Sequence, residues 1–241
     1  MENINKNAKI IGIGNEGISN LESIYSVVKE NVDTEKININ QDVDKEYVRQ
    51  LLDGVDILLL TYSTEDKRAV DIVKAISFMA GERRVLSIGL NSSEKEHKEE
   101  LGLNQEFLIN EENCNEIMNI INLMIEAVSD FCMISIDLTD LKELFASEGG
   151  IKYSFNKFDT SKSEVEIAEE LISNIKEVGT DFIEKKGILF VEMNNSENAI
   201  VFLHNVLTAI QEKSASTYEI IFSLYMKESS KDEVKFGLVY N

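Results

Sequence analysis

The first half of the chain alternates short apolar runs with segments whose apolar residues recur at helical spacing. The runs predict buried strands at 8–13, 36–40, 55–61, 84–90 and 106–109. The helical spacing predicts helices just after the glycines that follow the first strand, over 44–52 and around 70–76. Strands and helices that alternate in this way are typical of a parallel, doubly wound sheet. We therefore expect an α/β, Rossmann-like domain over residues 1–111.

The second half follows a different pattern. A long amphipathic helix is predicted over 112–131, with apolar residues at 117, 120, 121, 124, 125 and 128. Beyond it we expect helices over 140–147, 163–177 and 197–213, and strands over 150–156, 187–193, 218–226 and 233–240. Only 227–232 separates the last two strands, which predicts a hairpin. The pattern therefore predicts a central connecting helix and then a smaller α+β domain with a mixed sheet over 132–241.

The charge balance excludes some classes of partner. The chain has 44 Asp and Glu residues against 24 Lys and Arg, a net charge of -20, which repels nucleic-acid phosphates and anionic membranes. We therefore expect no nucleic-acid partner and no direct membrane contact. The apolar runs are shorter than the roughly 20 residues of a membrane-spanning helix, and the first residues lack a secretory signal. We expect a cytoplasmic protein.

Candidate metal and redox chemistry is sparse. Cys114 and Cys132 do not form a disulfide framework, and His97 and His204 add no metal-ligand spacing. We expect two ordinary thiols and no metal site.

The segment KIIGIGNEGISN near the N-terminus contains a G-x-G-x-x-G at Gly12, Gly14 and Gly17. Between a strand and a helix, this spacing marks a turn whose backbone amides approach a phosphate. Asn15 and Glu16 occupy the interior of the turn, where a carboxylate repels an anion. The glycines also suit a sharp turn and close helix packing, and neither of these needs a ligand.

The closing segment YEIIFSLYMKESSKDEVKFGLVY, 218–240, resembles the last two strands of the bacterial division protein FtsZ. Four further segments resemble FtsZ segments and occur along the chain in the family's order. They are KIIGIG at 9–14, DGVDILLLT at 53–61, EFLINEEN at 106–113 and MISIDLTDLK at 133–142. The similarity covers nearly the whole chain. It implies the FtsZ/tubulin-like fold, with a nucleotide site on the first domain.

The residues depart from the family pattern where the phosphates bind. In FtsZ a GGGTGTG loop wraps the phosphates, whereas the corresponding stretch here is YSTEDKRAV, 62–70, without a glycine. Glycine lets backbone amides approach phosphates closely. Glu65 and Asp66 add negative charge at this position, which Lys67 and Arg68 only partly offset.

The nucleotide site that the resemblance implies is therefore expected to be degenerate. The positions that correspond to it are Gly12, Gly14, Asn15, Glu16, Gly17, Thr61 and Ser63. The positions that contact the guanine base in the family align with Cys114 and Met118, whose side chains do not suit that role. We interpret the glycine motif as the remnant of a phosphate site.

The resemblance also implies a loop that supplies carboxylates to the GTP of a neighbouring subunit. Asp137 and Asp140 stand at its positions, with Ser135 where the family has Asn. Two carboxylates three residues apart at a helix start project to one side, which suits activation of a water molecule. The same residues also suit a helix cap, so both interpretations stay open.

These observations favour an interaction protein that has lost GTP binding and hydrolysis, with FtsZ or a second copy of itself as partner and no cofactor. The first alternative is a filament-forming GTPase with altered loops, which binds GTP. The second is a dinucleotide site with Asp42 on the ribose, although Asp42 lies beyond the usual spacing of about 20 residues.

Overall fold

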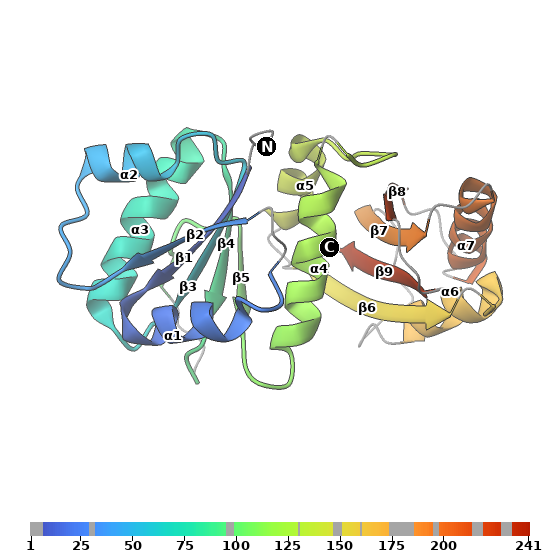
Figure 1. The fold of residues 1–241 in the computed structure, drawn as a ribbon, viewed down its shortest axis with the longest axis horizontal. Helices are drawn as coiled ribbons and strands as arrows, with labels where there is room; N and C mark the ends of the chain where they lie inside the picture. Colours follow the sequence, from blue (N-terminus) through green and yellow to red (C-terminus); the bar gives the residue numbers. More distant parts are fainter. Residues whose placement is uncertain are drawn as a thin grey trace. The chain divides into compact units, whose positions relative to one another are not determined.

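The computed structural model describes ten ranges of the chain: 7–28, 32–94, 99–129, 131–146, 151–159, 161–173, 186–194, 198–213, 219–227 and 233–241. The chain divides into two compact units, Met1–Met118 and Asn119–Asn241 (Figure 1). None of the helices in the described ranges combines the length and apolarity that a membrane crossing requires.

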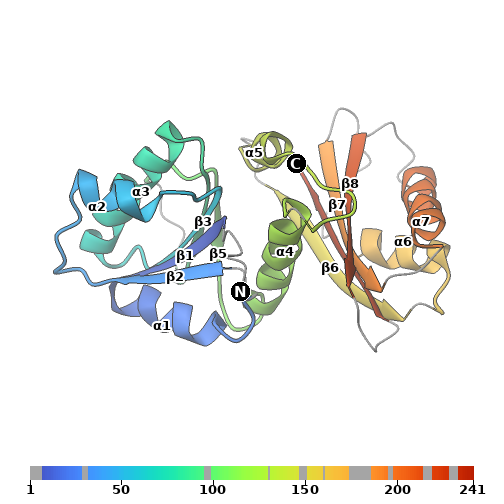
Figure 2. The ribbon, with the colours of Figure 1, turned by 45° about the horizontal axis from the view of Figure 1, so that its top comes forward.

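The first unit is a parallel, doubly wound sheet with the strand order β2-β1-β3-β4-β5. Its strands are β1 (Ala8–Ile13), β2 (Val32–Ile37), β3 (Ile57–Tyr62), β4 (Leu86–Asn91) and β5 (Gln105–Leu108). Its helices are α1 (Gly14–Ile24), α2 (Lys45–Leu51) and α3 (Lys67–Glu82). Figure 2 shows α1 on the opposite face of the sheet from α2 and α3. This arrangement confirms the predicted α/β class.

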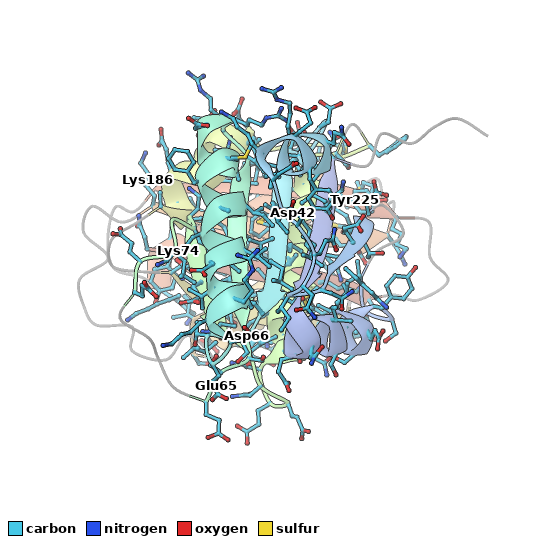
Figure 3. All side chains as sticks on the ribbon, turned by 90° about the vertical axis from the view of Figure 1, so that its left-hand side faces the viewer. Asp42, Glu65, Asp66, Lys74, Lys186 and Tyr225 are labelled. Atoms are coloured by element: carbon cyan, nitrogen blue, oxygen red, sulfur yellow. The ribbon has the colours of Figure 1, made fainter. Side chains whose placement is uncertain are left out.

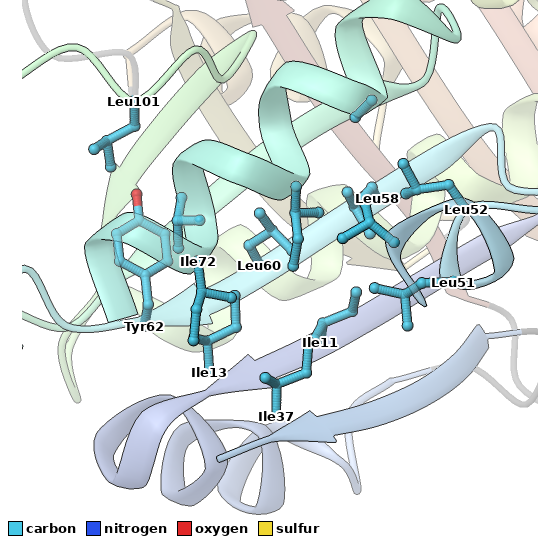
Figure 4. Close-up of a cluster of buried hydrophobic side chains, with 14 of the residues drawn as sticks. Ile11, Ile13, Ile37, Leu51, Leu52, Leu58, Leu60, Tyr62, Ile72 and Leu101 are labelled. Atoms are coloured by element: carbon cyan, nitrogen blue, oxygen red, sulfur yellow. The ribbon is translucent and has the colours of Figure 1, made fainter. Parts of the chain in front are cut away.

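The core of this unit lies where α2 and α3 cover the sheet. Side chains that alternate along β1 and β3 point to this face, among them Ile11, Ile13, Leu58 and Leu60, and all four are fully buried (Figure 4). The sheet is covered on both faces, which accounts for the continuous apolar run of β3. Packing of α2 and α3 on this face therefore helps to position β1 and β3 and the carboxyl ends of these strands.

The second strand differs most from its predicted position. It was expected at 36–40, whereas β2 begins at Val32 and ends at Ile37. Only these two end residues are buried, and the four between them are exposed. An edge strand of this kind carries no apolar run, and its parallel pairing with β1 decides where it lies.

The second unit contains a mixed sheet with the strand order β6-β9-β7-β8. Its strands are β6 (Lys152–Asp159), β7 (Lys186–Asn194), β8 (Glu219–Lys227) and β9 (Glu233–Tyr240). The remaining helices are α4 (Cys114–Ala127), α5 (Leu138–Phe145), α6 (Glu164–Ser173) and α7 (Ala199–Lys213). The boundary between the two units falls within α4. The mixed sheet confirms the predicted α+β character of the second half.

The predicted hairpin between the last two strands is wrong. β9 pairs antiparallel with β6 on one side and β7 on the other, and β8 pairs parallel with β7. The short connection at 228–232 lies outside the described residues. The reason for the order is burial, because Val234, Phe236 and Leu238 of β9 are fully buried whereas Ile220 and Phe222 of β8 are only half-buried.

Both faces of β9 are covered. Phe236 packs edge to face with Phe158 of β6 at a ring-centroid distance of 5.9 Å, on the side of α6 and α7. On the other side, a Cβ at Gly237 would lie 3.0 Å from Leu123 of α4. The strand that is last in sequence is therefore central to its sheet.

Candidate functional site

The first strand passes directly into the first helix. Ile13 keeps an extended conformation, and the next residue, Gly14, opens α1 with φ of 71°. A positive φ at this value is costly for residues with a side chain, so the turn requires glycine. No side chain caps α1, and Glu16 is the acidic residue of its first turn.

The other two glycines of the motif are required by packing. A Cβ at Gly17 would lie 2.2 Å from the carbonyl oxygen of Thr61 in β3, and a Cβ at Gly12 would lie 2.9 Å from the carbonyl oxygen of Gly17. Helix α1 therefore rests directly on the ends of β1 and β3. All three glycines have a structural role that needs no ligand.

Thr61 belongs to the same junction. Its side chain is fully buried, and its Oγ1 donates a hydrogen bond of 2.8 Å to the carbonyl oxygen of Gly17. The residue was expected in the degenerate nucleotide site. Its position shows that it ties α1 to β3 below the surface, so a bound ligand would not reach its hydroxyl without displacing that bond.

The turn after β3 is closed by hydroxyl groups. The backbone N–H of Thr64 donates to Ser93 Oγ at 2.7 Å, and Ser93 Oγ in turn donates to Asn91 Oδ1 at 2.7 Å. The backbone N–H of Glu65 donates to Ser63 Oγ at 3.3 Å. Two amides of this turn, which the sequence resemblance places at the FtsZ phosphate loop, are thus bonded to the protein itself.

Asp66 completes this closure. Its Oδ1 accepts the backbone N–H groups of Arg68 at 2.9 Å and Ala69 at 3.2 Å, which caps α3. Its own N–H donates to the carbonyl oxygen of Ser63 at 3.3 Å. The first amides of a helix are the groups that bind phosphate at such positions. Here a carboxylate of the chain occupies that place.

An open depression lies at the carboxyl ends of β1, β3 and β4, which is where doubly wound sheets bind ligands. Its lining residues are Glu16, Ser63, Glu65, Asp66, Ser92 and Glu94. Figure 3 shows Glu65 and Asp66 at one end of α3, with Lys74 farther along the helix. We call this the acidic depression, because four of its six lining residues are carboxylates.

The expected positive charges do not line the acidic depression. Lys67 and Arg68 are exposed, and Arg68 Nε donates to the carbonyl oxygen of Ile39 at 3.4 Å. Asp42, the candidate ribose ligand, is also exposed and outside the lining. Within the described residues, no three His, Cys, Asp or Glu side chains are grouped in a way that holds a metal ion.

Part of this site was missed in the sequence. Asn91 ends β4, and Ser92, Ser93 and Glu94 follow it. These residues either close the turn after β3 or line the acidic depression. The signal was present, because NSSE directly follows a buried strand in a parallel sheet, whose carboxyl ends meet at one edge.

Asp137 caps α5 in the second unit. Its Oδ1 accepts the backbone N–H of Thr139 at 2.6 Å, and this bond is the main reason that the pKa of Asp137 is lowered. Asp140 lies in the first turn of α5 and is exposed, as is Ser135. The cap interpretation of Asp137 is therefore confirmed, and a role of the pair in a subunit contact stays a prediction.

The start of α4 contains Cys114 and Met118, which the sequence resemblance aligns with the guanine-contacting positions of FtsZ. Cys114 is half-buried, and burial raises the pKa of its thiol. Met118 is fully buried. Cys132 is also a half-buried thiol, and its Sγ donates to the carbonyl oxygen of Ile134.

At the level of sequence, no protein-family model and no curated protein matches the chain. Solved structures do match. A single-substitution mutant of FtsZ from M. jannaschii has a TM-score of 0.68 at 11% identity, over 96% of this chain and 90% of that one. An empty FtsZ dimer from M. jannaschii gives 0.67 at 13% identity, over 97% and 88%. CetZ from Methanosaeta thermophila gives 0.61 at 10% identity, over 97% and 86%.

These similarities extend over nearly the whole chain, so the protein has the FtsZ/tubulin-like fold, as the resemblance in the sequence predicted. The identities are low, and a shared fold does not by itself carry a shared function.

Proposed function

We propose that this protein is an FtsZ-fold module that does not bind GTP and that acts through contacts with other proteins. The observation that carries the proposal is the turn after β3. Its amides at Thr64 and Glu65 and those at the start of α3 are bonded within the chain, and carboxylates surround the acidic depression beside it.

The carboxylates and the bonded amides both disfavour the binding of a nucleotide. A carboxylate about 4 Å from a phosphate charge costs about 1 kcal/mol in water-like surroundings and about 4 kcal/mol at the dielectric typical of protein surfaces. Freeing a bonded amide costs roughly another 0.5 to 1.5 kcal/mol for each hydrogen bond. With four carboxylates in the lining, these costs are large relative to ordinary nucleotide affinities.

The alternative is a filament-forming GTPase with altered loops. One observation favours it: α1 begins at Gly14 without a side-chain cap, as helices that bind an anion do. The carboxylates of Asp137 and Asp140 would then serve hydrolysis in a neighbouring subunit. The acidic side chain of Glu16 in the same first turn opposes this alternative.

Titration with a fluorescent GTP analogue and magnesium separates the two functions. We expect no saturable signal from this protein, with FtsZ from the same host as the positive control. Saturable binding at micromolar concentration would contradict the proposal and support the GTPase. A variant that carries Glu16→Gln and Glu65→Gln then shows whether charge alone prevents binding, because it leaves the cap by Asp66 in place.

The partner is tested separately. Host FtsZ is assembled with GTP, and the pelleted fraction and GTPase rate are measured with and without this protein. If FtsZ is the partner, either quantity changes with the amount of protein added. Unchanged values for both would remove FtsZ from the candidates and leave other proteins or a second copy.

A further inference from the structure

Helix α3 has an exposed face in the first unit. The residues of this face follow one another at intervals of three or four, which places their side chains on one side of the helix. They are Lys67, Asp71, Lys74, Phe78 and Glu82, and all are exposed except Lys74, which is half-buried. In Figure 3 α3 faces the viewer, with Asp66 at one end and Lys74 farther along. We call this surface the α3 face.

The apolar centre of the α3 face is Phe78. Its side chain is 67% exposed, whereas Val73 and Ile76 of the same helix are buried in the core of the unit. One exposed apolar residue is common on a protein surface. Here the small residue Ala75 is exposed one turn before Phe78, so a neighbouring helix can approach closely enough to cover the ring. Aromatic side chains in such positions often dominate the energy of an interface.

The charges at the two ends of the α3 face are unfavourable for the isolated helix. Lys67 is the first residue of α3 and Glu82 is the last. A helix dipole favours the opposite order, with acidic groups at the start and basic groups at the end. Among the described residues, neither Lys67 nor Glu82 has an ion-pair partner within its own chain. Both charges are therefore available to a partner that carries the complementary order.

A second copy of α3 in antiparallel orientation carries that order. The first residue of each helix then lies beside the last residue of the other, so Lys67 meets Glu82 at both ends of the contact. Phe78 lies four residues before the end of α3, and Asp71 lies four residues after its start. The ring of each copy therefore reaches the middle of the other helix, near Ala75. Such a contact is isologous and closes on a dimer.

The residues that flank α3 continue the same pattern. Glu65 lies two residues before Lys67, and Arg84 lies two residues after Glu82. Both are exposed, and the antiparallel alignment brings Arg84 of one copy toward Glu65 of the other. Arg84 has a φ of 58°, a left-handed conformation that favours glycine. The pairing of opposite charges thus extends beyond both ends of the helix.

We infer that two copies of this chain associate through their α3 faces, with the helices antiparallel, Phe78 at the centre and Lys67–Glu82 pairs at both ends. The net charge of -20 on each copy opposes association, but charges farther apart than about 8 Å are largely screened at physiological salt. One pair of helices makes a small interface, so we expect a dissociation constant of roughly 10 to 100 μM. The inference goes beyond the proposed function, because it requires nothing of the nucleotide site.

Sedimentation velocity of the full chain without nucleotide tests the dimer at concentrations from about 1 to 300 μM. We expect Phe78→Ser to weaken association at least about tenfold. Tyr25→Ser is the control, because Tyr25 is 64% exposed at the end of α1 and lies outside the α3 face. A monomer at every concentration, or equal weakening by both variants, would overturn the inference. Circular dichroism checks that both variants are folded.

Charge variants test the alignment of the two helices. Lys67→Glu and Glu82→Lys each place like charges at both ends, and we expect each alone to weaken the dimer about tenfold. Both changes suit the helix dipole, so this loss does not reflect unfolding of α3. Lys45→Glu on α2 changes the net charge as Lys67→Glu does, and we expect it to leave the dimer nearly unchanged.

The two charge variants should rescue each other. An equal mixture of Lys67→Glu and Glu82→Lys restores opposite charges at both ends, so we expect a mixed dimer of native affinity. The double variant Lys67→Glu/Glu82→Lys should also form a native-like dimer, because each end again pairs opposite charges. Failure of the mixture to associate would overturn the inference. A monomeric double variant would do the same, because only parallel helices would place its like charges together.

The outcome is independent of the GTP titration. A monomeric protein that binds no GTP rejects the α3 contact and leaves the proposed function in place. A protein that binds GTP and still dimerises through Phe78 rejects the proposed function alone.

Discussion

At the scale of single residues, the glycine motif shows how one pattern serves two purposes. Gly12, Gly14 and Gly17 have the spacing of a phosphate turn, yet each has its own steric reason in the fold. Gly14 needs a positive φ, Gly12 allows α1 to lie close to β1, and Gly17 allows α1 to lie close to β3. The residue types alone do not distinguish a ligand's requirement from a packing requirement, because both ask for the absence of a side chain.

Replacing Gly17 measures that packing requirement. In Gly17→Ala the new Cβ would lie 2.2 Å from a backbone oxygen of β3, so α1 or β3 must move. We expect the free energy of unfolding to fall by about 1 to 3 kcal/mol, measured by urea denaturation with circular dichroism.

Gly81→Ala in α3 is the control for this experiment. Apart from the adjacent residues and the backbone of α3 itself, no atom of the structure lies within 4 Å of its Cβ position, so the change is expected to stabilise the helix by up to about 1 kcal/mol. A Gly17→Ala variant as stable as Gly81→Ala would show that the close approach of α1 to β3 is not required.

The environment of Tyr62 was not predictable from the sequence and is given only by the tertiary structure. It is fully buried, and its hydroxyl donates to Glu106 Oε1 across to β5. Burial, followed by the negative charge of Glu106, raises the pKa of Tyr62 above its usual 10.0. The stabilisation linked to this shift is present below pH 10.0 and is lost as pH rises further, because the tyrosine of the unfolded chain ionises first.

Comparison of Tyr62→Phe with the native protein tests this linkage. At neutral pH we expect the variant to be less stable by about 1 kcal/mol, because the hydrogen bond to Glu106 is lost. Above pH 10.0 the difference in urea midpoint should shrink. Tyr25→Phe is the control, since Tyr25 is 64% exposed and should show no such change. A constant difference across this pH range would contradict the raised pKa.

At the scale of elements, apolar periodicity located most helices and strands. It failed for the position of β2, whose residues are mostly exposed, and for the pairing of β8 and β9. β9 was expected at 233–240 and occupies those residues. β2 was displaced because its exposed residues give no apolar run. The predicted hairpin was wrong because the apolar side chains of β9 are buried in the middle of the sheet, between β6 and β7, although β8 is the strand that precedes β9 in sequence.

Truncations in the two closing strands separate a central strand from an edge strand. Phe236→Ala removes a fully buried ring from β9, and we expect a loss of about 3 to 5 kcal/mol in the free energy of unfolding. Ile220→Ala in β8 should cost about 1 to 2 kcal/mol, because that side chain is only half-buried. Similar losses for both in urea denaturation would contradict the strand order.

At the scale of the whole molecule, the FtsZ/tubulin-like fold is retained at identities of 10–13%. Such a fold needs apolar residues at the right period and glycines where the backbone requires them. It does not need the chemistry of a nucleotide site. The chemistry of the acidic depression is therefore a better guide to function than the overall topology.

The sequence by itself determined the alternation of strands and helices, the parallel first sheet, the acidic charge and the absence of glycine after β3. These are local properties, read from neighbouring residues and from composition. Only the tertiary structure decided that β9 is central, that Ser93 accepts an amide of the turn after β3, and that Asp66 accepts the first amides of α3. The physical reason is that these features join groups far apart in sequence, and packing selects their partners.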